Sequence, residues 1–276
     1  MDEPLRLMHV HAHPDDEASK GAASTAKYVA EGVTVRVVTC TGGERGDVLN
    51  PALTVDPAHL ADLRRQEMAR AAEILGVEHV WLGFEDSGFP SGDPKPPLPH
   101  GCFADLPLEQ VTPALVDQII EFRPHVITTY DENGGYPHPD HIRTHEITMA
   151  AVRDAADEWQ VPKVYYHQTF HRAKILALHE AALANGFDSP YAAWIDDVKM
   201  RPADDHRVTT RVRCEQYFDV RDAALKAHAT QIDPEGHWFA LPSAIAAQVW
   251  PTEDFELAAS TVGVEVPEDD LFHGLR

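Results

Sequence analysis

The sequence is poor in cysteine and in basic residues, and it has no long apolar segment. Its three cysteines, Cys40, Cys102 and Cys214, are widely spaced and form no CxxC pair, which excludes a disulfide framework and a zinc ribbon and fits a reducing compartment. Lys and Arg number 23 against 45 Asp and Glu, so the formal net charge is −22. Such a molecule repels nucleic-acid backbones and anionic membranes. We therefore expect neither a nucleic acid nor a membrane as a partner.

Two further absences concern location and motifs. The first residues, MDEPLRLMHV, lack the basic stretch and apolar core of a secretion signal, and no apolar run approaches the length of a membrane span. We expect a cytoplasmic protein. The chain also lacks a P-loop, a G-x-S-x-G motif and an H-E-x-x-H motif, which argues against serine hydrolases and zincins.

Strand-like and helix-like segments alternate along residues 1–170. Apolar runs rich in β-branched residues predict strands at 5–10, 33–40, 77–82, 125–130 and 163–170. Periodic segments predict helices at 18–31, 57–75, 113–122 and 140–159, the third with Thr112 as its cap. This alternation predicts a Rossmann-like three-layer α/β/α fold with a mainly parallel sheet.

The rest of the chain, 171–276, is predicted to be an elaborated C-terminal extension that packs on the core and contributes to the substrate cleft. Its patterns predict helices at 172–185 and 214–230, a strand at 207–212 and little regular structure after Ile232. Residues 83–107, rich in Pro and Gly, predict a long surface loop, and loops of this length in compact domains are usually functional or mobile.

Polar residues that follow two of the predicted strands have the spacing of a metal site. His13-Pro14-Asp15-Asp16-Glu17 follows the first strand, and Tyr136-Pro137-His138-Pro139-Asp140-His141 follows the fourth. In an open α/β sheet such segments meet at the carboxyl edge of the strands. Imidazole and carboxylate are ordinary Zn²⁺ ligands, and a catalytic site needs three of them with one position open. Each segment alone also suits a capped helix N-terminus, but together they predict one metal site.

Other functions compete with a hydrolytic metal site. His13-x-Asp15 with a distant histidine also fits the two-His-one-carboxylate iron oxygenases, but those enzymes are built on all-β folds. Nucleotide binding would need a first glycine where Thr41 stands, and the carboxylates of the first turn would repel a pyrophosphate. A metal-dependent binding protein without turnover is a further alternative.

The segments HAHPDDE and TYDENGGYPHPDH resemble motifs of the LmbE-like or PIG-L family of metal-dependent deacetylases, which hydrolyse amides of glucosamine compounds. The resemblance extends to VVTCTGGERGD, RRQEMARAAEILGVEHVWLGFEDSG, VTTRVRCEQYF and AHATQID, so it covers nearly the whole chain. These longer matches look like the branch that acts on S-conjugates of the thiol mycothiol. The resemblance implies a small-molecule thiol conjugate as substrate, cleaved between glucosamine and N-acetylcysteine. The alternative is deacetylation of N-acetylglucosaminyl-inositol by the same machinery.

The resemblance also implies the ligands and the base. His13, Asp16 and His141 would hold Zn²⁺, for which Fe²⁺ is an alternative because the same ligand set accepts both. Asp15, beside the metal but not bound to it, would take a proton from the water that the metal activates and deliver it to the departing amine. The oligomeric state is left open.

Further residues are implied to act on the substrate. His138, oriented by Asp140, and the phenol of Tyr136 would stabilise the oxyanion, where loss of one donor typically costs about a hundredfold in turnover. Four charged side chains are implied to bind the substrate: Lys20, Glu44, Arg64 and Asp86. Lys20 lies one helical turn after Asp16 and resembles the conjugate-cleaving branch.

Overall fold

The protein is described by a computed structural model for residues 3–200 and 204–276. Within these residues the strands form one seven-stranded sheet of order β3-β2-β1-β4-β5-β7-β6. The strands are β1 (Arg6–His11), β2 (Thr34–Thr41), β3 (Glu78–Phe84), β4 (Val126–Thr129), β5 (Lys163–His167), β6 (Thr210–Arg213) and β7 (Thr252–Ser260). Strands β1 to β5 pair in parallel, and β7 pairs antiparallel with both β5 and β6. The mainly parallel sheet is as predicted.

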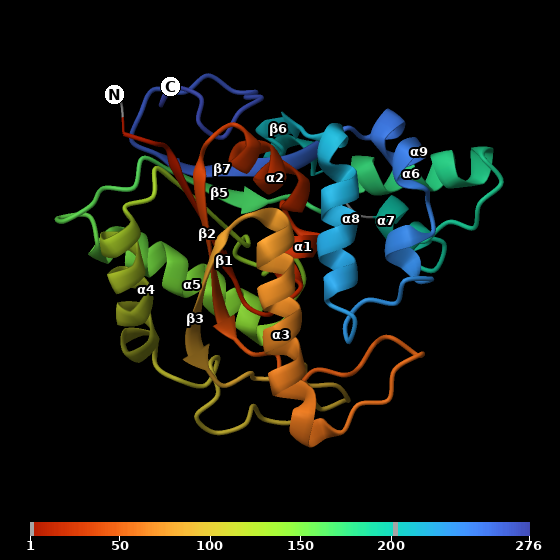
Figure 1. The fold of residues 1–276 in the computed structure, drawn as a ribbon, viewed down its shortest axis with the longest axis horizontal. Coiled ribbons are helices and arrows are strands. Elements are labelled where there is room, and N and C mark those ends of the chain that lie inside the picture. Colours follow the sequence, from red (N-terminus) through yellow and green to blue (C-terminus); the bar gives the residue numbers. More distant parts are fainter. Residues whose placement is uncertain (1–2, 201–203) are drawn as a thin grey trace.

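Helices cover both faces of the sheet (Figure 1). They are α1 (Asp16–Ser19), α2 (Ala22–Ala30), α3 (Pro57–Leu75), α4 (Leu108–Phe122), α5 (Pro139–Asp154), α6 (Arg172–Ala184), α7 (Ile195–Met200), α8 (Phe218–Ala227) and α9 (Ser243–Val249). Short 3₁₀ turns are η1 (Asp205–Arg207), η2 (Glu215–Tyr217) and η3 (His237–Phe239). No described helix combines the length and the apolar composition needed to cross a bilayer.

Alternating side chains of the central strands build the two main apolar layers. In β1, Met8 packs with α4 and α5 on one face, whereas the preceding Leu7 packs with Tyr28 of α2 on the other. Strands buried on both faces are typical of parallel sheets covered by helices. The three-layer α/β/α prediction is therefore confirmed.

The predicted helix over 18–31 is wrong in one respect, because a break divides it into α1 and α2. Lys20 is extended, and Gly21 has a φ of +88°. A Cβ atom at Gly21 would lie 2.8 Å from Cε1 of His167 on β5. The close approach of that strand therefore requires glycine here, and the break leaves Lys20 beside Asp16.

The helix predicted from Thr112 begins a turn earlier, at Leu108, and carries Pro113 inside it. The hydroxyl of Thr112 donates to the carbonyl of Leu108 (2.8 Å) instead of capping the helix. The earlier start buries Val111 completely in the main core. The helix predicted over 140–159 ends at Asp154, because Trp159 turns back to donate to the carbonyl of Pro124 (2.8 Å).

The largest error of prediction lies after Ile232, where the structure contains α9 and the nine-residue strand β7. The acidic residues of TEDFELAAS interrupt the apolar pattern by which a strand is predicted, but in the fold they bind to other protein groups. Glu253 accepts from the N-terminal amides of α2, and Glu256 pairs with Arg207 (2.7 Å). Residues 171–276 thus supply two strands of the sheet, and a division of the chain at residue 170 stays a prediction.

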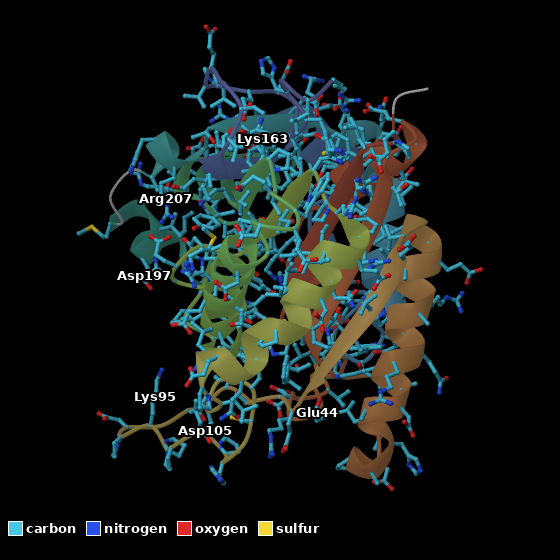
Figure 2. All side chains as sticks on the ribbon, turned by 90° about the vertical axis from the view of Figure 1, so that its left-hand side faces the viewer. Glu44, Lys95, Asp105, Lys163, Asp197 and Arg207 are labelled. Atoms are coloured by element: carbon cyan, nitrogen blue, oxygen red, sulfur yellow. The ribbon has the colours of Figure 1, made fainter. Side chains whose placement is uncertain are left out.

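The carboxyl ends of β1 to β5 lie at one edge of the sheet. Figure 2 shows Glu44, after β2, at the same end of the molecule as Lys95 and Asp105, which follow β3. Lys163, the first residue of β5, lies toward the opposite end. This is the edge at which open α/β sheets bind their ligands.

Candidate metal centre

The turn after β1 and the start of α5 bring the three predicted metal ligands together. The backbone N–H of His13 donates to Oδ2 of Asp16 (3.1 Å), which folds the turn back on itself. Nδ1 of His13 lies 3.7 Å from this oxygen, and Nε2 of His141 lies 3.5 Å from it. Two imidazoles therefore flank one carboxylate oxygen.

Other donors stand close enough to take part. One candidate group joins His138 to His13 and His141, with ligand atoms all within 4.8 Å of one another. A further group joins His13 to Asp86 and Asp140 by the same measure. The residues that could hold a metal therefore extend beyond the predicted three.

Hydrogen bonds separate the roles of His138 and His141. Nδ1 of His141 lies 3.0 Å from the carbonyl of Gly134, so it carries the proton and leaves Nε2 as a lone-pair donor. Nδ1 of His138 instead accepts from the backbone N–H of Asp140 (3.1 Å), so in the neutral ring Nε2 carries the proton. These tautomers are assigned from the hydrogen-bond network. They favour His141 as a ligand and His138 as a proton donor.

Two buried atoms lack partners in a way that fits a cation. Nε2 of His141 and Oδ1 of Asp140 are buried without a hydrogen-bond partner in the described chain. Burying such an atom unpaired costs about 1–3 kcal/mol. Burial holds the pKa of His141 well below its usual value, which keeps the ring neutral and able to bind a metal. The donor set of imidazole and carboxylate therefore fits a metal ion such as Zn²⁺ or Fe²⁺.

Tyr130 and Lys20 hold the Asp16 carboxylate from two sides. The phenol of Tyr130 donates to Oδ2 (2.6 Å), and its ring stacks on His141 with 4.2 Å between centroids. Nζ of Lys20 lies 2.5 Å from Oδ1. Burial would raise the pKa of Asp16, but Lys20 and the histidines outweigh it and hold the pKa well below its usual range. Tyr130 is not among the residues predicted above. Its position directly after β4, at the carboxyl edge of the sheet, is the one feature of the sequence that could have indicated a role at this site.

Asp15 occupies a backbone conformation that non-glycine residues rarely adopt, with a φ of +97°. Its N–H donates to Oε2 of Glu17 (3.0 Å), and Oε1 of Glu17 lies 2.5 Å from Nε2 of His228. Burial and the adjacent Asp16 raise the pKa of Asp15 to about 6. A carboxylate with a pKa in this range is suited to exchange protons near neutral pH.

Glu17 and His228 form a buried pair that supports this turn. Both side chains are almost fully buried. Burial alone would lower the pKa of His228, but the facing Glu17 carboxylate outweighs it and raises the pKa. Neither residue is among those predicted above. In the sequence, Glu17 is explained by a position near the N-terminus of a helix, where the dipole favours a carboxylate. The segment AHATQID, which contains His228, has no pattern that indicates a function.

The second motif segment departs from prediction at Asp140. Its carboxylate lies 3.2 Å from Nε2 of His13 and accepts from the backbone N–H of Ser87 (2.9 Å), so the side chain contacts His13 where a contact with His138 was expected. Only the backbone of Asp140 hydrogen-bonds to His138. Burial lowers the pKa of His138 to about 4, so its ring is neutral at pH 7.

Tyr136 is 45% exposed and packs edge-on against His141, with 4.6 Å between ring centroids. Partial burial and the surrounding carboxylates raise the pKa of its phenol. The phenol therefore keeps its proton and can donate it to an oxygen at this site.

Glu44, Arg64 and Asp86 lie together on the β2 and β3 side of the centre. Oε1 of Glu44 accepts from the N–H of Asp86 (2.8 Å), and Oδ2 of Asp86 accepts from the N–H of Arg45 (2.8 Å). Arg64 is buried under Gly43, where a Cβ atom would lie 2.5 Å from Nη1. The three charged residues thus order the two loops, and Oδ1 of Asp86 also lies 3.7 Å from Nε2 of His13.

Comparisons with known proteins show what this chain is similar to. Residues 8–152 match the family model PIG-L, described as GlcNAc-PI de-N-acetylase. The mycothiol S-conjugate amidase of Streptomyces coelicolor is 56% identical over 290 residues, covering 100% of this chain and 99% of the relative. A 1D-myo-inositol 2-acetamido-2-deoxy-alpha-D-glucopyranoside deacetylase of Geodermatophilus obscurus is 40% identical over 291 residues, covering 98% of each.

A solved structure shares the fold at low identity. The N,N'-diacetylchitobiose deacetylase of Pyrococcus horikoshii superposes with a TM-score of 0.61 at 18% identity, covering 92% of this chain and 84% of that one. The family match spans both motif segments and all three predicted ligands. This chain therefore belongs to the PIG-L, or LmbE-like, family.

Proposed function

We propose that the protein is a metal-dependent amidase that cleaves mycothiol S-conjugates between glucosamine and N-acetylcysteine, releasing a mercapturic acid and glucosaminyl-inositol. The observation that carries the proposal is the meeting of His13 and His141 at Asp16 beside Asp15, in a chain similar over its whole length to a mycothiol S-conjugate amidase. The role would be the removal of electrophiles as thiol conjugates.

The proposed chemistry divides between the ion and the protein. Zn²⁺, with Fe²⁺ as the alternative, would be held by His13, Asp16 and His141 and would supply a Lewis acid that activates water. Asp15 accepts the proton of the attacking water at its carboxylate and returns it to the amine nitrogen as the C–N bond breaks. The raised pKa of Asp15 suits both transfers.

Oxyanion stabilisation is proposed for two neutral donors. Nε2–H of His138 and the phenol of Tyr136 would donate to the carbonyl oxygen as it gains negative charge. The proximity of the rings of Tyr136 and His138, which meet edge to face with 6.1 Å between centroids, supports a shared role. Lys20, Glu44, Arg64 and Asp86 are proposed to contact or order the substrate around this point.

The second candidate is deacetylation of N-acetylglucosaminyl-inositol. The similarity to an inositol acetamidoglucoside deacetylase favours it, and the same centre can cleave either acyl group. Lys20 beside Asp16 supports the amidase over the deacetylase. We propose that the reaction takes place in the cytoplasm. The substrate is a small-molecule thiol conjugate.

The test is a side-by-side rate measurement on both substrates with purified protein of known metal content. We expect kcat/KM for an S-alkylated mycothiol conjugate to exceed that for N-acetylglucosaminyl-inositol by at least tenfold. Faster release of acetate would transfer the protein to the deacetylase function, and cleavage of neither substrate by metal-loaded protein would overturn both functions.

A further inference from the structure

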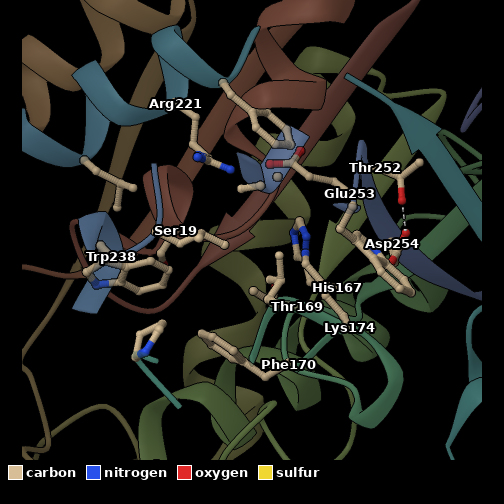
Figure 3. A pocket seen from close by; sticks show the side chains of 18 of the residues that line it. Ser19, His167, Thr169, Phe170, Lys174, Arg221, Trp238, Thr252, Glu253 and Asp254 are labelled. Atoms are coloured by element: carbon tan, nitrogen blue, oxygen red, sulfur yellow. Dashed lines mark hydrogen bonds between the residues drawn. The ribbon is translucent and has the colours of Figure 1, made fainter. Parts of the chain in front are cut away.

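An apolar cavity, here called the aromatic cavity, is lined by α6, α8, α9, β7 and the residues Ser19 and Gly21 (Figure 3). Its volume is about 110 Å³, several times the roughly 10–15 Å³ that one water molecule needs. Its aromatic and aliphatic wall includes Phe170, Leu178, Tyr191, Trp238, Leu241 and Trp250.

Three charged side chains at this wall, Arg221, Glu253 and Asp254, are bound by other protein groups, and Lys174 is a fourth charged residue of the wall. Glu253 accepts from the N–H of Ser24 (2.7 Å), and Asp254 accepts from the indole N–H of Trp250 (2.7 Å). The guanidinium of Arg221 pairs with Asp222 (2.7 Å). The cavity therefore offers an incoming group mainly apolar and aromatic surface.

Two contacts connect the aromatic cavity with the metal centre. Oγ of Ser19, at the cavity wall, lies 3.1 Å from Nζ of Lys20, and that Nζ lies 2.5 Å from Asp16. A neighbouring cavity lined by Lys20, Tyr130 and Tyr136 shares three wall residues with the aromatic cavity: His167, Thr169 and Phe170. Figure 3 shows His167, Thr169 and Phe170 close together beside Ser19 and Trp238.

The strand order sets the direction in which a bound substrate extends. The predicted ligands follow β1 and β4, which are neighbours in the middle of the sheet. The polar loops carrying Glu44 and Asp86 follow β2 and β3 on one side, whereas the aromatic cavity takes His167 from β5 and Phe255 from β7 on the other. An amide bound at the centre therefore has polar partners for one half and apolar partners for the other.

We propose that the aromatic cavity binds the apolar substituent on the sulfur of the conjugate, so that it determines which thioethers are accepted. This inference rests on the proposed function. The glucosaminyl-inositol half, rich in hydroxyls, would lie over the β2 and β3 loops, and the N-acetylcysteine half would direct its thioether toward β5 and β7. An aryl or long alkyl group would displace water from Phe170 and Trp238, whereas a methyl group would not reach them.

The test compares two conjugates that differ only in the sulfur substituent, S-benzyl and S-methyl. Ala246 lies on α9 at the cavity wall, so Ala246→Trp would fill the space. Because steric fit in an apolar pocket changes kcat/KM by about 10–200-fold, we expect the benzyl-to-methyl ratio to fall at least tenfold. The matched control is Ala184→Trp, the same change at an exposed residue of α6 outside the cavity, which should leave the ratio within twofold.

Two further variants keep the test informative if Ala246→Trp does not fold. Trp238→Phe and Trp250→Phe should each reduce the tryptophan fluorescence change that the product S-benzyl-N-acetylcysteine causes in the parent protein. An unchanged benzyl-to-methyl ratio in folded Ala246→Trp, or a fluorescence response retained in full by both tryptophan variants, would overturn the cavity proposal while leaving the amidase standing. Failure of the parent protein to cleave either conjugate would instead overturn the proposed function itself.

Discussion

Among the described residues, two clusters of three histidines could hold a metal ion. The site cluster is His13, His138 and His141, and the deep cluster is His9, His11 and His167. Each has its ligand atoms within 4.8 Å of one another, so distance alone does not distinguish them. The two clusters differ in the partners of their histidines and in the orientation of the histidine rings.

The partners of the site cluster are carboxylates and those of the deep cluster are hydroxyls. His13 contacts Asp16, Asp86 and Asp140. In the deep cluster, His9 contacts the hydroxyls of Thr128 (2.5 Å) and Thr25 (2.8 Å), and His167 contacts that of Thr128 (2.9 Å). Carboxylates compensate the charge of a divalent cation that leaves water, and the site cluster has carboxylates as partners.

Ring orientation separates the clusters further. The rings of the deep cluster are nearly parallel, with interplanar angles of 15° to 27°. In the site cluster the angles are 31° to 71°. A metal lies in the plane of each imidazole that binds it, so stacked parallel rings cannot all point at one ion. The site cluster, with carboxylate partners and splayed rings, is therefore the better candidate for a metal site.

The largest effect should follow from removing a ligand at the site cluster. His141→Ala should reduce bound metal to well below one equivalent and the hydrolysis rate by about 10⁴-fold or more, because the activation of water is lost. Metal analysis of the purified protein and a conjugate hydrolysis assay check this. The matched variant in the deep cluster, His9→Gln, should retain its metal. Loss of metal from His9→Gln with retention in His141→Ala would reverse the comparison.

Asp15 provides the next largest effect, because it separates metal binding from proton transfer. Asp15→Asn should keep the full metal content and lose about a hundred- to a thousandfold in kcat, the range of a general base. Equal turnover by Asp15→Asn would assign the base to another residue. Asn also tolerates a positive φ better than most residues, so the turn should keep its conformation.

The position of Asp15 depends on the contact between Glu17 and His228, which lie far apart in the sequence. His228→Leu removes the partner of Glu17, and leaving a buried charge unpaired costs about 3–5 kcal/mol of stability. We expect a fall of about tenfold in kcat with unchanged metal content, since Asp15 is held less firmly. The double variant Glu17→Gln with His228→Leu removes the unpaired charge and should recover stability without recovering kcat. Recovery of both would show that His228 acts only on stability.

These residues indicate which parts of the site the sequence could predict. The proximity of His13, Asp16 and His141 was predictable because each lies in a short polar segment directly after a strand. Tyr130 contacts Asp16 across 114 positions and His228 contacts Glu17 across 211 positions, so their roles depend on the packed fold. Strand β7 was missed for a related reason, because its acidic residues find their partners on α2 and near β6.

The deep cluster should also make the protein sensitive to mild acid. Burial, with the facing imidazoles of the cluster, holds the pKa values of His9 and His167 well below 6.5. Below pH 6.5 the unfolded chain therefore binds more protons than the folded one, and stability falls as pH falls, by up to about 1.4 kcal/mol per pH unit for each group. Urea unfolding of chelator-treated protein at pH 7.5 and 5.5 measures this loss. His9→Gln should make the loss smaller, and an equal or larger loss would assign the acid sensitivity elsewhere.

The smallest effect is expected at His11, where both ring nitrogens are buried without a hydrogen-bond partner in the described chain. An unpaired buried polar atom costs about 1–3 kcal/mol, so His11→Leu should leave the free energy of unfolding unchanged or raise it by about 1 kcal/mol. His9→Leu is the matched control, because it removes one hydrogen-bond partner from each of the hydroxyls of Thr25 and Thr128 and should lower stability by about 1–3 kcal/mol. A loss in His11→Leu as large as that in His9→Leu would mean that His11 has a partner, such as an ordered water, and that the deep cluster is wetter than its packing indicates.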